Sequence, residues 1–136
     1  MDGTEWIGTL LLNTTCAQAR ARGNEAVGNP NLPAWPEHLQ LVPRAISDPY
    51  HGDPYHDIVA WIREVNAPAV PLRCRDETDS RDFDRLVETL RSGSYYAVVK
   101  WGNGSQAKER LLLLPLNGGL LCAAFTEDGI PMRPTK

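Results

Sequence analysis

The last third of the chain constrains the fold most, because three strand-forming runs follow one another there with turn sequences between them. The runs are YYAVVKW at 95–101, KERLLLLPL at 108–116 and LLCAAFTE at 120–127. WGNGSQ carries the Asn-Gly signal of a β-hairpin between the first two runs, and NGG at 117–119 precedes the third. This order predicts a three-stranded antiparallel meander. Because LLLLPL has no polar alternation, its strand should be buried on both faces, or form a barrel wall covered by helices.

Two amphipathic helices are predicted upstream of the meander. In HDIVAWIREV, apolar side chains recur at helical spacing at Ile58, Val59, Trp61, Ile62 and Val65. Asp57 is the expected N-cap of this helix, and Asn66 with Pro68 should end it. In RDFDRLVETLRSG, one face carries Phe83, Leu86, Val87 and Leu90. Ser80 is the expected N-cap of that second helix and Gly93 its C-cap, with RDETDS before it as a solvated loop.

Four further strands are expected from shorter patterns. EWIGTLLLN at 5–13 suits a buried strand, and Gly8 inside it suggests a bend or bulge. The segment 17–22 reads as an irregular, exposed strand, because its alanines have weak strand propensity. In HLQLVPRAI at 38–46, Leu39 and Leu41 alternate with polar residues. AVPLRC at 69–74 is expected at a sheet edge or bulge, because Pro71 cannot donate a ladder hydrogen bond.

The order of these elements is strands, helix, strand, helix and then three strands. It predicts an α+β domain in which a curved sheet or barrel is flanked by two or three helices. A length of 136 residues fits one domain spanning residues 1–136.

Composition excludes several classes of protein. With 42% hydrophobic and 23% charged residues, the chain should fold rather than remain disordered. A net charge of −3 gives no global basic field that would attract nucleic acid. No apolar run is long enough to span a bilayer and no signal peptide is recognisable, so an intracellular, soluble protein is expected. Cys16, Cys74 and Cys122 are too far apart to suggest a disulfide framework or zinc site, and are interpreted as buried small hydrophobes.

The segment DPYHGDPYHD at 48–57 repeats a Tyr-His pair and invites a metal or acid-base interpretation. A loop could bring His51, His56 and Asp53 together, which leaves a small metal-dependent hydrolase as one alternative. However, the prolines exclude a helix, no familiar metal motif is present, and Asp-Pro is a strong turn former. The segment is therefore interpreted as a connector. Nucleophile-elbow, P-loop and dinucleotide motifs are also absent from the sequence, so we expect a protein that is not an enzyme and needs no cofactor.

Several of these segments together resemble a known module. They are WIGTL at 6–10, LPAWPEHLQLVPRAI at 32–46, FDRLVETLRSGSYYAVVKW at 83–101 and RLLLLPL at 110–116. The set resembles the SPOC domain, which is found in Spen-type transcriptional regulators and in proteins that associate with RNA polymerase II. It is also similar to the activator-interaction domain of a Mediator subunit, and both are similar to the Ku β-barrel. The resemblance implies a distorted, mostly antiparallel seven-stranded β-barrel with two or three flanking helices.

The resemblance also implies a function in protein–protein interaction. SPOC domains bind peptide segments of transcription regulators, and several bind phosphoserine through a basic patch. The expected partner is accordingly a peptide of a transcription regulator, a Mediator-type activator or the RNA polymerase II tail, and the expected location is the nucleus. Arg44 occupies the arginine of the family's L-x-[LIV]-x-x-R motif, and its guanidinium could hold a phosphate or carboxylate bidentately. A surface arginine in a rim ion pair is the alternative.

The rest of the expected patch is less regular. Many SPOC domains have Tyr-Leu and a lysine before the strand that begins YYAVV here, whereas this chain has Thr89, Leu90 and Gly93. Additional candidates for the peptide-binding surface are Arg20, Arg22, Lys100, Tyr95, Tyr96 and Trp101. The same cations and tyrosines leave a single-stranded RNA-binding domain as a second alternative, although the overall acidity argues against it. The domain is expected to be monomeric in isolation.

Overall fold

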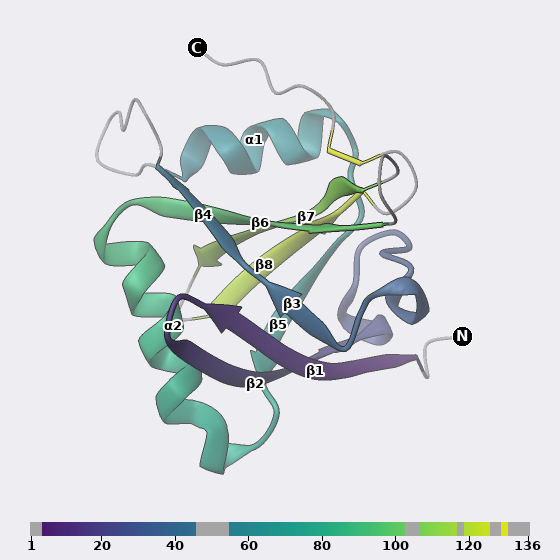
Figure 1. Cartoon of the computed structure of the whole chain (residues 1–136). Helices are drawn as coiled ribbons and strands as arrows, with labels where there is room; N and C mark the ends of the chain where they lie inside the picture. Colours follow the sequence, from purple (N-terminus) through teal and green to yellow (C-terminus); the bar gives the residue numbers. More distant parts are fainter. Residues whose placement is uncertain (1–3, 46–54, 103–106, 117–118, 126–128, 131–136) are drawn as a thin grey trace.

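The computed structural model describes residues 4–45, 55–102, 107–116, 119–125 and 129–130. Its eight strands form one mixed sheet in the order β3-β1-β2-β5-β8-β7-β6-β4. The strands are β1 Glu5–Leu12, β2 Thr15–Arg22, β3 His38–Gln40, β4 Val42–Ala45, β5 Ala69–Cys74, β6 Tyr95–Trp101, β7 Lys108–Leu116 and β8 Gly119–Ala124. The helices are α1 His56–Glu64 and α2 Ser80–Ser92, with short 3₁₀ turns η1 Gly23–Glu25, η2 Leu32–Ala34 and η3 Glu77–Asp79. The fold is the expected α+β class (Figure 1).

The two ends of the strand order are consecutive in sequence, and this curls the sheet into a nearly closed barrel. β3 pairs in parallel with β1, while β4 pairs antiparallel with β6. Only Leu41 separates β3 from β4, and its backbone N–H donates to the carbonyl of Leu11 at 2.8 Å. The division at Leu41 gives eight strands where seven were expected. All the remaining pairings are antiparallel, so the expected mostly antiparallel barrel is confirmed.

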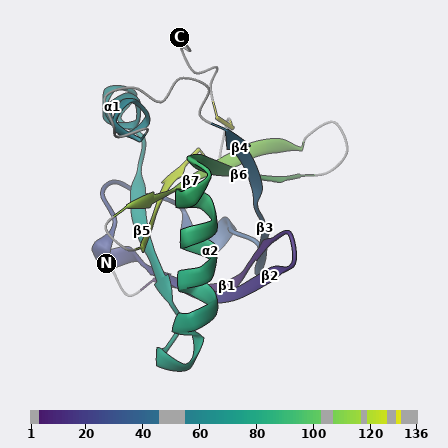
Figure 2. The same cartoon turned by 90° about the vertical axis from the view of Figure 1, so that its left-hand side faces the viewer.

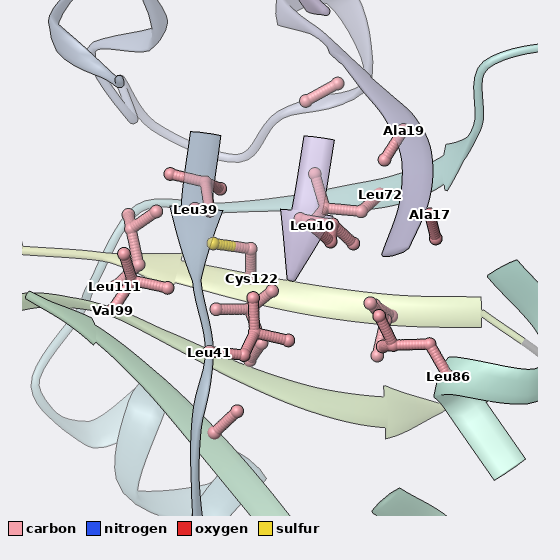
Figure 3. Close-up of a cluster of buried hydrophobic side chains, with 14 of the residues drawn as sticks. Leu10, Ala17, Ala19, Leu39, Leu41, Leu72, Leu86, Val99, Leu111 and Cys122 are labelled. Atoms are coloured by element: carbon pink, nitrogen blue, oxygen red, sulfur yellow. The ribbon is translucent and has the colours of Figure 1, made fainter. Parts of the chain in front are cut away.

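The barrel interior and α2 share the main hydrophobic cluster. Figure 3 shows side chains from β1, β2, β5 and α2, labelled Leu10, Ala19, Leu72 and Leu86, among the buried residues of this cluster. Figure 2 shows α2 in front of one end of the barrel, with β5 on one side of it and β3 and β4 on the other. The expectation of an exposed strand at 17–22 was wrong, because Ala17, Ala19 and Ala21 are at most 1% exposed. Their small side chains leave room for α2 to pack closely against β2.

A second cluster lies on the outside of the barrel, beneath α1. Along β7, Leu111 and Leu113 belong to the interior cluster, whereas Leu112 and Leu114 belong to the outer cluster with Trp61. This alternation confirms that the LLLLPL run is buried on both faces because a helix covers the barrel wall. Burying both leucine pairs contributes about 1.5–3 kcal/mol for each side chain.

Both helices form close to where the sequence predicted them, with displaced N-caps. Tyr55 precedes α1 and Asp79 precedes α2, whereas Asp57 and Ser80 were expected. Gly93 is the C-cap of α2, as predicted. After α1, Asn66 adopts a left-handed conformation (φ 60°), and its N–H and that of Ala67 donate to carbonyls of the last turn. This arrangement satisfies helix-end carbonyls that would otherwise lack partners.

Two strand irregularities differ from expectation. Gly8 causes no register shift between β1 and β2. Instead it admits the Trp6 ring, since a Cβ at Gly8 would come within 2.5 Å of Trp6 Cζ2. β5 lies between β2 and β8 and is not an edge strand. Pro71 is tolerated because the β2 ladder on that side of β5 covers only Arg73 and Cys74.

The cysteines differ in their environments. Cys122 is fully buried, Cys74 is half-buried and Cys16 is exposed. The prediction of a buried small hydrophobe is therefore confirmed for Cys122 and wrong for Cys16. Desolvation raises the pKa of the Cys122 thiol above its usual range.

Candidate functional site

Arg44 lies on the outer surface of the barrel, on the strand that closes it. β4 places Arg44 opposite Tyr96 of β6. Its guanidinium Nη2 forms an ion pair with Oε2 of Glu109 on β7, so the side chain reaches across β6. The Arg44 side chain is 44% exposed and that of Glu109 is 32% exposed, which leaves the pair accessible. An incoming anion would therefore bind Arg44 beside the Glu109 carboxylate or in its place.

Lys100 and Lys108 line a cavity together with Glu109. The ladder between β6 and β7 shifts register between Val99 and Lys100, and the shift brings Lys100 opposite Glu109. A cavity of about 350 Å³ lies here, lined by Lys100, Ala107, Lys108, Glu109, Gly129 and Ile130. Together with Arg44, the described residues around this cavity contribute three cations and one carboxylate. The surface is thus locally positive in a protein whose net charge is −3.

The two candidate tyrosines occupy opposite sides of β6. Tyr95 is 36% exposed, and its backbone carbonyl accepts a hydrogen bond from the Tyr55 hydroxyl at 3.0 Å. Tyr96 is half-buried and packs against the outer cluster beneath α1. Tyr96 therefore supports the surface near Arg44, whereas the Tyr95 ring remains available to a ligand.

Trp101 is half-buried against the interior cluster. The Arg110 guanidinium lies 5.9 Å from the centre of its ring, and Arg110 Nε donates to the Trp101 carbonyl at 3.1 Å. This is a cation–π arrangement that helps fix the end of the β6–β7 hairpin.

Arg20 and Arg22 do not share a surface with Arg44. They lie on β2, which β5, β8 and β7 separate from β6 along one side of the barrel, and β1 and β3 separate from β4 along the other. Arg22 pairs with Glu5 across the β1–β2 ladder at 3.4 Å. The sequence candidates therefore divide into an Arg44 surface, formed by Arg44, Lys100, Lys108 and Glu109, and a separate group on β2.

The alternative metal site is only partly covered by the structure. His51 and Asp53 lie outside the described residues. His56 is exposed at the start of α1, with its Nδ1 at 3.6 Å from Asp57 Oδ1. Within the described part of the chain, no group of three or more His, Cys, Asp or Glu side chains is arranged to hold a metal ion.

Sequence reasoning missed Glu109 and Lys108. The Asn-Gly hairpin signal could have placed β7 beside Lys100, but the observed register depends on the shift after Val99. The ion pair with Arg44 depends on closure of the barrel by β4, which joins segments far apart in the sequence. Neither feature leaves a local sequence pattern.

Comparisons with known proteins identify the fold. No protein-family model and no curated protein matches the sequence. Among solved structures, the chain is similar to the crystal structure of the SPOC domain of human PHD-finger protein 3, with a TM-score of 0.56 and 16% sequence identity. The match covers 87% of this chain and 92% of that one. The chain therefore has a SPOC-like fold. Among the described helices, none is long and apolar enough to cross a membrane.

Proposed function

We propose that residues 1–136 form one non-catalytic interaction domain that binds a peptide segment of a transcription regulator at the Arg44 surface. The observation that carries this proposal is the accessible Arg44–Glu109 pair beside a cavity flanked by two lysines. The SPOC-like fold and the position of Arg44 in the L-x-[LIV]-x-x-R motif support it. A nuclear location and a partner such as a Mediator-type activator or the RNA polymerase II tail belong to the same proposal.

Glu109 favours a phosphorylated ligand over a carboxylate ligand. A carboxylate that replaces Glu109 exchanges one monoanion for another and gains little. A phosphoserine carries about −1.5 to −2 charges and three acceptor oxygens, so it can engage Arg44 and the neighbouring lysines together. Its hydrogen bonds with the guanidinium would be charge-assisted and bidentate. The flanking peptide would lie along β4, where the side chain of Val42, two residues before Arg44, is 43% exposed and supplies apolar contact.

The test is calorimetric titration of the wild-type protein and of Arg44→Gln with matched phosphoserine and serine peptides. Peptides from the tail of RNA polymerase II and from acidic activators form the panel. Arg44→Gln should weaken phosphopeptide binding by about 1 to 3 kcal/mol, the scale of a lost charge-assisted hydrogen bond. Thermal stability should change little, because an exposed ion pair contributes about 0–1 kcal/mol.

Arg81→Gln on α2 is the matched control, since it removes the same charge elsewhere on the surface. Glu109→Gln should strengthen binding of the unphosphorylated acidic peptides, because it removes the competing carboxylate. The proposal fails if Arg44→Gln binds as tightly as wild type. Preferential, salt-sensitive binding of single-stranded RNA would favour the RNA alternative instead.

A further inference from the structure

The outer surfaces of β1, β2 and β5 carry a row of three side chains that neighbour one another across the sheet. Ile7 of β1 stands opposite Arg20 of β2, and Arg20 stands opposite Arg73 of β5. We call these three residues the Arg20 row. In both Figure 1 and Figure 2, α1 lies on the opposite side of the barrel from β1 and β2. The row is thus on a different surface from the outer cluster that α1 covers.

The two arginines of the row form a directly opposed pair of like charges. Such a cross-strand pair is destabilising unless an anion lies between its members. Arg73 donates from Nε to both carboxylate oxygens of Glu25, at 3.2 and 3.3 Å, and Arg22 pairs with Glu5. The Arg20 side chain has no hydrogen bond or ion pair with any residue that the structure describes, and its Nε is buried. The unsatisfied member is therefore the central one.

Apolar surface lies on both sides of this cationic pair. Ile7 is 50% exposed, so its aliphatic side chain is accessible beside Arg20. On the other side, β5 exchanges β8 for β2 as its partner after Leu72, and a cavity of about 410 Å³ opens at this fork. Its lining is mostly apolar, with Cys74, Phe83, Leu120 and Leu121 among its residues, and it includes two charged residues, Arg73 and Asp84. Arg73 therefore lines the cavity as well as facing Arg20.

We propose that the Arg20 row is a second interaction surface, which binds an acidic peptide segment of a partner protein. One carboxylate bridges Arg20 and Arg73 through the terminal nitrogens of Arg20, since its Nε is buried, and relieves the repulsion between the two guanidiniums. Aliphatic neighbours of that carboxylate contact Ile7 and the cavity at the β5 fork. This surface is independent of the Arg44 surface.

The row suits a peptide better than a nucleic acid. Single-stranded nucleic acids bind along basic grooves with aromatic rings on which bases stack. None of the three residues of the row is aromatic, and the carboxylates of Glu5 and Glu25 lie beside it. A short anionic group with aliphatic neighbours matches both its charge and its apolar flanks.

The test uses a fluorescein-labelled peptide in which glutamate and leucine alternate. Its binding to the protein is measured by NMR and by fluorescence anisotropy. The Nε–Hε signals of Arg20 and Arg73 and the amide of Ile7 should shift on titration. Arg20→Gln should weaken the binding that these signals report by about tenfold, because it removes the central guanidinium. Arg81→Gln and Arg44→Gln should leave the affinity for this peptide within about twofold of the wild-type value, because both variants remove surface charges outside the row.

Three results would overturn the proposal. The first is the absence of shifts at Arg20 and Arg73 at saturating peptide. The second is equal weakening by Arg81→Gln, which would indicate a general charge effect. The third is tighter binding of oligouridine than of the acidic peptide to the same residues. Failure of the Arg44 surface in the calorimetric test would leave these signals unaffected, so the two proposals fail separately.

Discussion

At the scale of single residues, close packing around Trp6 shows why a glycine is needed in β1. The Trp6 indole N–H donates to the carbonyl of Pro36 at 2.9 Å, and its ring lies 5.4 Å from that of Trp35. Gly8 faces the Trp6 ring and the Glu37 carbonyl. The residue was expected to bend the strand, but its contribution is space for an aromatic side chain. Local sequence cannot distinguish these two uses of glycine, because the tryptophan contact is tertiary.

Gly8→Ala should lower the free energy of unfolding by about 1–3 kcal/mol, the usual cost of overpacking a dense core. Urea denaturation at equilibrium would measure it. Gly119→Ala is the matched control, since a Cβ there would meet its nearest neighbour, the Leu72 carbonyl, at 3.5 Å, an ordinary contact distance. Equal losses in both variants would contradict the packing argument.

The three cysteines should react at very different rates with a thiol reagent. Burial raises the pKa of Cys122, so at pH 8 its thiolate fraction in the folded protein is far below that of a free cysteine. Cys16 is exposed and should be the first of the three to react. Mass spectrometry after alkylation at pH 8 should find Cys122 unmodified until denaturant is added. Modification of Cys122 at the rate of Cys16 in the native protein would show that the core opens easily.

At the scale of elements, β2 shows how far local propensity can mislead. Its alanines gave weak strand propensity and suggested an exposed segment, yet Ala17, Ala19 and Ala21 are buried against α2 and the barrel interior. Small residues are needed in β2 because α2 packs closely against it. The sequence of the strand alone does not show where the helix lies. By contrast, burial of both faces of β7 was predicted correctly from its uninterrupted apolar run, and the buried face of α2 was predicted correctly from its helical periodicity.

Helix α2 completes the interior cluster, so truncating its buried face should be costly. Leu86 is fully buried and lies on the face of α2 that packs into this cluster. Leu86→Ala should reduce the free energy of unfolding by about 2–5 kcal/mol through the lost transfer energy and the cavity left behind. Glu88→Ala, at an exposed position of the same helix, should stay within about 0.5 kcal/mol of wild type. Similar midpoints for both variants in urea denaturation would contradict this account of α2.

At the scale of the whole molecule, the architecture was largely predictable but the candidate site was not. The order of elements and their periodicity predicted an α+β barrel, and the position of Arg44 on its surface followed from the strand pattern at 38–46. The partner of Arg44 did not follow, because Glu109 reaches it only through barrel closure and a register shift. The separation of Arg20 from Arg44 was also invisible, since strand order in a closed sheet is a long-range property.

The seam between β4 and β6 should be the least protected part of the barrel. It comprises four residue pairs, one of which contains Pro43, a residue with no N–H to donate. The β7–β8 ladder comprises six pairs and is covered by α1. Native-state hydrogen exchange should therefore show faster exchange at the amides of Val42 and Arg44 than at those of Leu113 and Cys122. Equal protection at the two sites would mean that the barrel opens only by global unfolding.

The position of this seam also has a consequence during synthesis. β4 pairs only with β6, so Val42 cannot form its strand pair until Val98 has been synthesised and has left the ribosome. During that interval the nascent chain carries an unpaired strand edge next to the apolar residues of the β1–β2 hairpin, and such edges associate readily with other chains. The protein should therefore need a chaperone most while its N-terminal half has been synthesised and β6 has not.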